Sequence, residues 1–273
     1  MKLSIITATY NRPDKLSAIA LSSLLAQTDC DFEWVVINDG ANHHSKEIIK
    51  DLIAPFSTTY IETKHSETGF GLCHARNAGI RAATGNLISY LDDDNKLFPE
   101  FVANTKSFFK TNSYVKYSMT LQNRRRDVVK NNKTVTAGKT FISPNTDCTI
   151  EELILQNQIF DSNGFTHCNN DSLQWNPDYK VFADYEFLLQ CTNLFNRTTF
   201  QLNSQILVKY IQSSIGAIGS STYQQWGNEL KQLVNDNIHY KLKKNEIENL
   251  VYLSTKYLAK GNKKLNAFVK NKA

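Results

Sequence analysis

Three adjacent carboxylates, Asp92, Asp93 and Asp94, end an apolar run in the segment GNLISYLDDDN. Like charges this close raise one another's pKa unless a cation or a hydrogen-bonding ligand offsets their repulsion. A solvated turn is the commonest reason for an Asp run at the end of a strand. The alternative is a divalent cation, held by one or two carboxylates and by the phosphate oxygens of a ligand.

Polar side chains also end two earlier β-rich runs. Thr9 and Asn11 lie in ATYNRP after the first run, and Asp39 lies in INDGA after the second. Ligands of open α/β sheets bind beyond the carboxyl ends of the strands. We therefore expect these three residues and the acidic run to line one crevice.

A glycine-containing loop, ETGFG, precedes a predicted helix, LCHARNAGIRAA, which carries Arg76 in its second turn. A helix N-terminus with nearby glycine amides favours a diphosphate. The loop is not a dinucleotide fingerprint, because His74 occupies the third glycine position and the loop does not follow the first strand. It also lacks the Lys-Ser/Thr pair of a P-loop. An NAD enzyme and an ATPase are both disfavoured.

Alternating strands and helices must position these groups. From Leu3 to about Leu121, β-rich runs alternate with helical patterns, which predicts βαβ units on a mainly parallel sheet. The predicted strands span residues 3–9, 32–39, 58–63, 86–91 and 114–121. The predicted helices span residues 13–27, 45–55, 72–85 and 98–110. Pro13 suits a first helical position, and Gly85 is expected to cap the third helix.

The pattern is less regular after residue 122. Residues 123–139 are consistent with a hairpin or a surface excursion, and the arginines at 124–126 indicate a solvated edge. A helix across 184–195 and a strand within 199–211 follow. From about Tyr223, two amphipathic helices are predicted, over 223–242 and 245–260.

The composition, with 41% hydrophobic and 21% charged residues, is that of a soluble globular protein. The net charge of +5 is modest and the basic residues are scattered up to the tail 256–273, so nucleic acid is not an expected partner. No window approaches ~18 consecutive apolar residues, and the N-terminus lacks a signal-peptide core. Five widely spaced cysteines fit a reducing cytoplasm.

Three strings, LSIITATYNRPDKLSAIALSSLLAQT, WVVINDGA and GLCHARNAGIRAATGNLISYLDDDN, together resemble the inverting family-two glycosyltransferases of the GT-A fold. Their order and intervals are similar, and the resemblance covers about the first hundred residues. It implies an α/β, nucleotide-diphospho-sugar transferase fold, with a mainly parallel mixed sheet flanked by helices and followed by C-terminal helices. It also implies sugar transfer from a nucleotide-diphosphate donor, expected to be a UDP-sugar, to an acceptor hydroxyl with inversion.

The acidic run corresponds to the family's Asp-x-Asp region. The resemblance implies that Asp92 or Asp93 contacts the ribose and that Asp94 coordinates Mn²⁺ or Mg²⁺. The family's nucleotide-recognition positions correspond to Thr9, Asn11, Asp39 and Arg76. Asp39 is expected to accept the N–H of a uracil ring, and Arg76 to face the base or the diphosphate. Asn38 stands where family members usually have a second acidic residue.

The segment NPDYKVFADYEFLLQC resembles the family's Glu-Asp-Tyr segment, in which the Asp is the acceptor-side base. Asp184 matches that base, while Ala183 replaces the common Glu. Glu186 is the alternative base. A structural alternative for Asp184 is an N-cap of the following helix, which Asp does well.

The family often has a histidine after the last core strand, where this chain has Gln212 or Ser213 in VKYIQSSIGAIGSS. This departure puts the dependence on metal in question. His43 and His44 are expected to form a surface pair at a helix start. His167 is expected to be a group of the core or of the acceptor cleft.

Within one catalytic domain we expect a nucleotide-sugar-binding half over 1–121 and an acceptor-binding half over 122–222, followed by a helical appendage over 223–273. The expected acceptor is a glycan, a glycolipid or a glycoprotein. The expected location is cytoplasmic, and the basic tail allows peripheral contact with the inner face of a membrane.

Two other functions remain open. A sugar-nucleotide nucleotidyltransferase would normally have a Gly-rich loop after the first strand, and TATYNRPDK has no glycine. A non-catalytic carbohydrate-binding or scaffold protein of the same fold is favoured by Ala183 and the missing histidine, and opposed by the intact acidic run.

Overall fold

The computed structural model describes residues 1–40, 42–131 and 133–264. Half of the basic tail, residues 265–273, lies outside these ranges, and the expected membrane contact depends on it. Within the described ranges, no helix has both the length and the apolar character needed to cross a bilayer.

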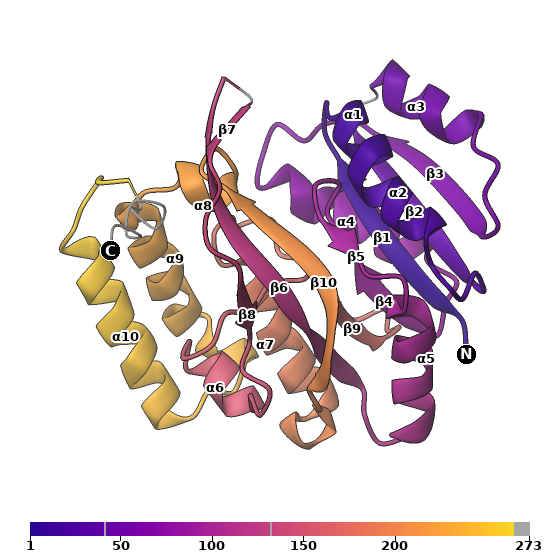
Figure 1. The fold of residues 1–273 in the computed structure, drawn as a ribbon. Helices are drawn as coiled ribbons and strands as arrows, with labels where there is room; N and C mark the ends of the chain where they lie inside the picture. The colour runs from indigo at the N-terminus through magenta and orange to yellow at the C-terminus, as the bar shows by residue number, and fades with distance from the viewer. Residues whose placement is uncertain (41, 132, 265–273) are drawn as a thin grey trace.

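The N-terminal half of the molecule contains four parallel strands in the order β3, β2, β1, β4 (Figure 1). Their bounds are Ser57–Thr63, Phe32–Asp39, Leu3–Thr9 and Leu87–Tyr90. Every residue of β1, β2 and β4 is buried, because helices cover both faces of a parallel sheet. These four of the five predicted strands are confirmed, and β1 and β2 have the predicted bounds.

Side chains of β1 alternate between two hydrophobic cores, as successive residues of a strand must. Ile6 packs in the core on the α4 side, and Ile5 packs in the core that contains Leu16 and Phe101. The helices around this half are α1, η1, α2, α3, α4 and α5, which span Pro13–Lys15, Leu16–Leu21 (π-helical), Ser22–Leu25, His43–Lys50, Gly71–Ala82 and Phe101–Thr111. Pro13 occupies the first helical position, as predicted.

The prediction that Gly85 caps α4 is wrong. The C-cap residue is Ala83, whose backbone is extended, so the chain leaves the helix directly toward β4. Gly85 is required for another reason, because a Cβ there would lie 2.5 Å from Oγ of Ser4. The glycine lets the turn pass close over the start of β1.

The second half of the sheet continues from β4 through β9, β6, β10 and β5. These strands span Phe165–Cys168, Tyr117–Lys130, Asn203–Ser213 and Lys96–Leu97. Strand β9 is antiparallel to both of its neighbours, whereas β6 and β10 are parallel. The end of β6 forms a hairpin with β7 (Lys133–Thr136), and β8 (Phe141–Ser143) pairs with β6 as well. The hairpin alternative for residues 123–139 is therefore correct.

The C-terminal helices lie on the side of the molecule opposite to α3, next to α7 (Figure 1). The remaining helices are α6, α7, η2, α8, α9, η3 and α10, which span Ile150–Ile154, Ala183–Phe195, Arg197–Thr199, Ala217–Ser220, Tyr223–Asn235, Asn237–His239 and Lys244–Leu258. Leu230 of α9 and Leu250 of α10 are fully buried in the core that also contains Leu188 of α7. The two helices predicted after Tyr223 are confirmed, but the first ends at Asn235 and not at residue 242.

Candidate active site

A pocket of about 460 Å³ lies beyond the carboxyl ends of β1, β2 and β4. Six of the residues singled out in the sequence line it: Thr9, Asp39, Arg76, Asp92, Asp94 and Asp184. Asn11 lies outside the pocket, where its Oδ1 accepts a hydrogen bond from Asn42 at 3.2 Å. The rule that ligands of α/β sheets bind beyond the carboxyl ends of the strands, here called the strand-end rule, thus correctly predicts that most of these groups lie together. Their roles remain predictions.

Asp93 is the buried member of the acidic run. Its side chain is 0% exposed, and it accepts a hydrogen bond from Oγ1 of Thr9 at 2.8 Å and an ion pair from Arg12 at 2.8 Å. Burial raises the pKa of Asp93 to about 7, and Arg12 opposes that rise. Because its carboxylate is enclosed by these partners, Asp93 supports the pocket wall from behind.

Asp94 lines the pocket and forms ion pairs with two cationic side chains. Arg12 Nη1 and Lys15 Nζ both contact its Oδ2, at 3.0 and 3.1 Å. Both cationic side chains come from the segment that follows β1, and both are more than 40% exposed. The repulsion within the acidic run is therefore offset by cations of the protein itself.

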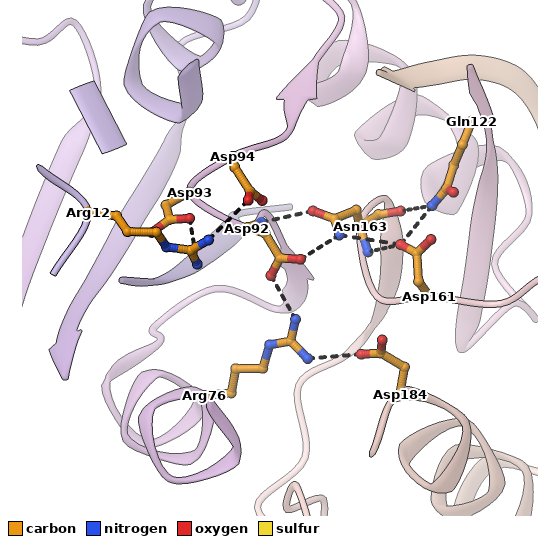
Figure 2. Close-up of polar contacts among 9 residues, drawn as sticks. All are labelled: Arg12, Arg76, Asp92, Asp93, Asp94, Gln122, Asp161, Asn163 and Asp184. Atoms are coloured by element: carbon orange, nitrogen blue, oxygen red, sulfur yellow. Dashed lines mark hydrogen bonds and ion pairs between the residues drawn. The ribbon is translucent and has the colours of Figure 1, made fainter. Parts of the chain in front are cut away.

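Asp92 is fixed by partners on two sides (Figure 2). Arg76 Nη2 contacts its Oδ1 at 2.9 Å, and Asn163 Nδ2 donates to its Oδ2 at 2.9 Å. The backbone N–H of Asp92 also donates to Asn163 Oδ1 at 2.8 Å. With 29% of its side chain exposed, Asp92 is available to a ligand in the pocket, whereas Asp93 is not.

Arg76 joins the acidic run to Asp184. Its guanidinium contacts Asp92 and Asp184 at 2.9 Å each and lies 4.2 Å from the ring centre of Trp175. Burial lowers the pKa of Arg76, but the two carboxylates raise it further, so the group stays charged. The expectation was that Arg76 faces a base or a diphosphate; in the structure it bridges two carboxylates.

Asp184 lies in the first turn of α7 and points toward Arg76 (Figure 2). The N-cap of that helix is Phe182, so the N-cap alternative for Asp184 is wrong. Burial raises the pKa of Asp184, and Arg76 opposes this. The alternative base, Glu186, is 2% exposed and lies outside the pocket, where it accepts a hydrogen bond from Tyr240 at 2.7 Å.

Asp39 has a partner that the sequence analysis missed. His65 Nδ1 lies 2.8 Å from Asp39 Oδ2, and the His65 ring stacks on Tyr10 with 4.5 Å between ring centres. Both rings line the pocket. His65 follows the carboxyl end of β3, so the strand-end rule that found Asp39 could have found it.

Arg12, Lys15 and Asn163 were also missed. The two cations follow the first strand, but nothing local shows that they pair with carboxylates about 80 residues later. Asn163 belongs to DSNGF, which matches no motif with a known mechanism. Gln212 and Ser213, which stand in place of the family histidine, do line the pocket.

Three further histidines, His43, His44 and His167, lie outside the pocket. His43 and His44 are 77% exposed at the start of α3 and form the expected surface pair. His167 is fully buried and within hydrogen-bond distance, 2.9 Å, of the Tyr90 hydroxyl. Burial lowers the pKa of His167 to about 4, so the ring is neutral at pH 7. His167 is therefore a core group, one of the two options expected.

A divalent cation fits only as part of a ligand complex. In the part of the chain that the structure describes, no three His, Cys, Asp or Glu side chains form a metal-binding group. Asp94 nevertheless offers a pocket-facing carboxylate whose Oδ2 holds two flexible, half-exposed cations. Mg²⁺ and Mn²⁺ sites of this kind use one or two carboxylates together with substrate phosphates. The residues present fit that arrangement.

This combination of a parallel α/β half-sheet, an acidic run at the end of β4 and a second, mixed half defines a GT-A glycosyltransferase fold. The chain belongs to glycosyl transferase family 2, whose family model matches residues 4–170. The structure of Staphylococcus aureus TarS 1–349 in complex with UDP-GlcNAc is similar, with a TM-score of 0.66 and 14% identity over 100% of this chain and 76% of that one. A Pyrobaculum calidifontis mannosyltransferase in complex with GDP-Man and Mn²⁺ has a TM-score of 0.56 and 15% identity, covering 94% of this chain and 74% of that one.

Curated relatives match the N-terminal region. An uncharacterized glycosyltransferase of Nostoc sp. is 34% identical over 115 residues, which is 42% of this chain and 35% of that protein. The chondroitin synthase of Escherichia coli is 39% identical over 93 residues, or 34% of this chain and 13% of that protein. The chain thus spans about a third or less of the length of these two relatives.

Proposed function

We propose that the protein transfers a sugar from a UDP-sugar to an acceptor hydroxyl with inversion. The observation that supports this most directly is the pocket in which Asp39, Asp92 and Asp94 lie opposite Asp184, at the carboxyl edge of the sheet. Membership of family 2 and the likeness in fold to TarS, which has been solved with UDP-GlcNAc, favour such a donor. A glycan, glycolipid or glycoprotein is the proposed acceptor, and the cytoplasm the proposed location.

In this proposal the donor lies along the carboxyl ends of β1, β2 and β4. Asp39 accepts a hydrogen bond from the uracil N–H. We assign the ribose contact to Asp92 and not to Asp93, because Asp93 is buried whereas Asp92 is partly exposed. Arg12 and Lys15 place positive charge at the diphosphate end of the pocket. A bound Mn²⁺ or Mg²⁺, held by Asp94, would neutralise negative charge on the leaving diphosphate.

Asp184 acts as the general base. It takes the proton of the acceptor hydroxyl, while that oxygen forms a bond to the anomeric carbon from the face opposite the leaving group. The bond from the anomeric carbon to the diphosphate oxygen breaks, and the diphosphate keeps the electron pair. Because this is a single displacement, no covalent sugar–enzyme intermediate forms. The ion pair with Arg76 opposes the rise that burial causes in the pKa of Asp184, and so favours the carboxylate form that accepts the proton.

Calorimetric titration with UDP, with and without Mn²⁺, tests the proposal without knowledge of the acceptor. We expect UDP to bind and its affinity to rise when Mn²⁺ is present. Asp94→Asn should lose the gain from Mn²⁺ and keep the affinity for UDP alone, which makes it the matched control. Failure of the wild-type protein to bind UDP in either condition would overturn the proposal.

Release of UDP from UDP-sugars then separates an enzyme from a carbohydrate-binding or scaffold protein. An enzyme should release UDP when a suitable acceptor is supplied, and this release should be lost in Asp184→Asn. UDP binding without any release from a panel of UDP-sugars and acceptors would favour the non-catalytic alternative.

A further inference from the structure

Asn163 grips Asp92 with both ends of its amide group. Its Oδ1 accepts the backbone N–H of Asp92 at 2.8 Å, and its Nδ2 donates to Asp92 Oδ2 at 2.9 Å. Asn163 is only 1% exposed and lies just before β9, on the chain segment beside the end of β4. Since an amide clamp fixes both the backbone and the carboxylate, it leaves Asp92 a single orientation.

A buried network in turn fixes Asn163 (Figure 2). Asp161 Oδ1 accepts the backbone N–H of Asn163 at 2.9 Å and lies 3.3 Å from its Nδ2. Gln122 donates to Asp161 and to the carbonyl of Asn163, and Arg124 forms an ion pair with Asp161. All of these side chains are less than 10% exposed. These hydrogen bonds favour one of the two possible orientations of the Asn163 amide, the one in which Nδ2 points at Asp92.

The network makes the sequence expectation for Arg124 wrong. Arg124 was expected at a solvated edge, but it is 4% exposed and lies 3.9 Å from the ring centre of Tyr210 as well as against Asp161. Its partner follows 37 residues later in the chain. A chain of contacts therefore runs from Arg124 in the second half of the sheet to Asp92 in the first.

We propose that Asn163 is a positioning residue that aims the Asp92 carboxylate at the ribose hydroxyls of the donor. The same contact holds Asp92 against Arg76, which also contacts Asp184, so Asn163 links the donor side of the pocket to the candidate base. This inference rests on the proposed function, because it concerns the ribose of a nucleotide donor.

The test compares UDP with 2′,3′-dideoxy-UDP, which lacks both ribose hydroxyls. We expect wild-type protein to bind UDP about tenfold more tightly, as befits hydrogen bonds to a charged acceptor. Asn163→Asp keeps the shape and the acceptor for the Asp92 N–H, but it places an oxygen where Nδ2 donates. The resulting repulsion should turn the Asp92 carboxylate away from the ribose. The affinity for UDP should therefore fall about tenfold, while the affinity for the dideoxy nucleotide changes less than about twofold.

Loss of the preference for ribose separates positioning from a general loss of structure. If Asn163 had only a structural role, its substitution would lower the affinities for both nucleotides by the same factor. The ratio of the two affinities would then stay unchanged. Asn203→Asp is the matched control, because Asn203 is 4% exposed, donates a hydrogen bond to Asn104 and, like Asn104, does not line the pocket. It should keep the wild-type ratio. Asn163→Ser, which removes both contacts without adding charge, replaces Asn163→Asp if that variant does not fold.

The outcomes distinguish the two proposals. Wild-type protein that fails to bind UDP overturns the proposed function and this inference together. Wild-type protein that binds UDP with no preference for the ribose hydroxyls overturns the inference and the ribose contact of Asp92, and leaves the proposed sugar transfer standing. The inference is also overturned if folded Asn163→Asp and Asn163→Ser proteins both retain the wild-type preference.

Discussion

At the scale of single residues, Lys15 and Arg12 share one oxygen of Asp94 and thus occupy the carboxylate that a divalent cation would use. Removing one of these cations should free Asp94 Oδ2 to bind a metal ion. It should also weaken diphosphate binding, because less positive charge then lies near the diphosphate. We expect Lys15→Met to raise the affinity for Mn²⁺ alone about fivefold and to lower the affinity for UDP by a similar factor, the size of an exposed ion pair of about 1 kcal/mol.

Electron paramagnetic resonance of free Mn²⁺ measures the first effect, and calorimetry measures the second. Lys46→Met is the matched control, since Lys46 is half-exposed and pairs with Glu62 away from the pocket. Affinities that move in the same direction for Mn²⁺ and for UDP would contradict the assignment of Lys15.

Asp184 is the residue whose loss should separate chemistry from binding. Asp184→Asn keeps the shape of the side chain but cannot accept the acceptor's proton, so transfer should fall about 10²- to 10⁴-fold. The affinity for UDP should stay within about twofold, because Arg76 retains Asp92 as a charged partner. Glu186→Gln, at a carboxylate outside the pocket, should keep its turnover. Wild-type turnover in Asp184→Asn would remove Asp184 from the mechanism.

At the same scale, the sequence gives the pocket-facing carboxylates but not what holds them. Asp39 is the last residue of β2, and Asp92 and Asp94 lie shortly after the end of β4. Topology places the carboxyl ends of such parallel strands at one edge of the sheet. Asn163 and Arg12 owe their roles to partners 71 and 82 residues away. No local pattern encodes such pairs, so they become visible only in the folded chain.

At the scale of elements, Glu33 of β2 ties together β1 and the turn that follows α4. It accepts hydrogen bonds from Ser4, Thr84 and Gly85 and an ion pair from Lys2, although it is only 3% exposed. Burial alone would raise the pKa of Glu33, but these contacts outweigh it and lower that pKa from 4.5 to about 2. Protonation of Glu33 at low pH should therefore lower the stability of the folded protein.

The direction of that effect follows from proton linkage. Because the pKa of Glu33 is lower in the folded state, its contribution is complete above about pH 4.5 and is lost as the pH falls toward 2. We expect Glu33→Gln to lose about 2–3 kcal/mol of stability at pH 7 and less at pH 3. Urea denaturation of both proteins across this range measures the difference. A gap that stays constant from pH 7 to pH 3 would contradict the linkage.

Elements were predictable where burial is uniform and less so where it changes along the chain. Strands β1 and β2 are apolar and wholly buried, and their bounds followed from the sequence. Strand β6 was predicted to end at residue 121 but extends to Lys130, because pairing with β7, β8 and β10 stabilises its polar end. Hydrogen bonds between strands, rather than residue type, determine that boundary.

At the scale of the whole molecule, one of the two hydrophobic cores joins β1 to α10. It contains Ile6 of β1, Leu188 of α7, Leu230 of α9 and Leu250 of α10. We expect Leu230→Ala to cost about 2–5 kcal/mol, the cost of a cavity in a packed core. Hydrogen exchange should show β1 and α10 losing protection together. Loss confined to α9 and α10 would show instead that the C-terminal helices unfold separately.

The same helix α9 reaches the candidate active site through Glu229. Its Oε2 accepts the backbone N–H groups of Lys180, Val181 and Phe182, at 3.1, 2.8 and 2.9 Å. Lys180 and Val181 line the pocket, and Asp184 follows two residues after Phe182. A carboxylate on a C-terminal helix therefore shapes the segment that presents the candidate base.

Glu229→Ala should free this segment and misplace Asp184. We expect transfer to fall about tenfold while UDP affinity changes less than about twofold, because a small misplacement of a catalytic group is costly whereas the donor contacts lie on other strands. Leu230→Ala, at the neighbouring position, is the matched control: it also destabilises α9 but leaves the three hydrogen bonds in place. Assays at a temperature where both variants are folded compare the two. If they lose transfer equally, general destabilisation explains the loss and Glu229 has no separate role in positioning the base.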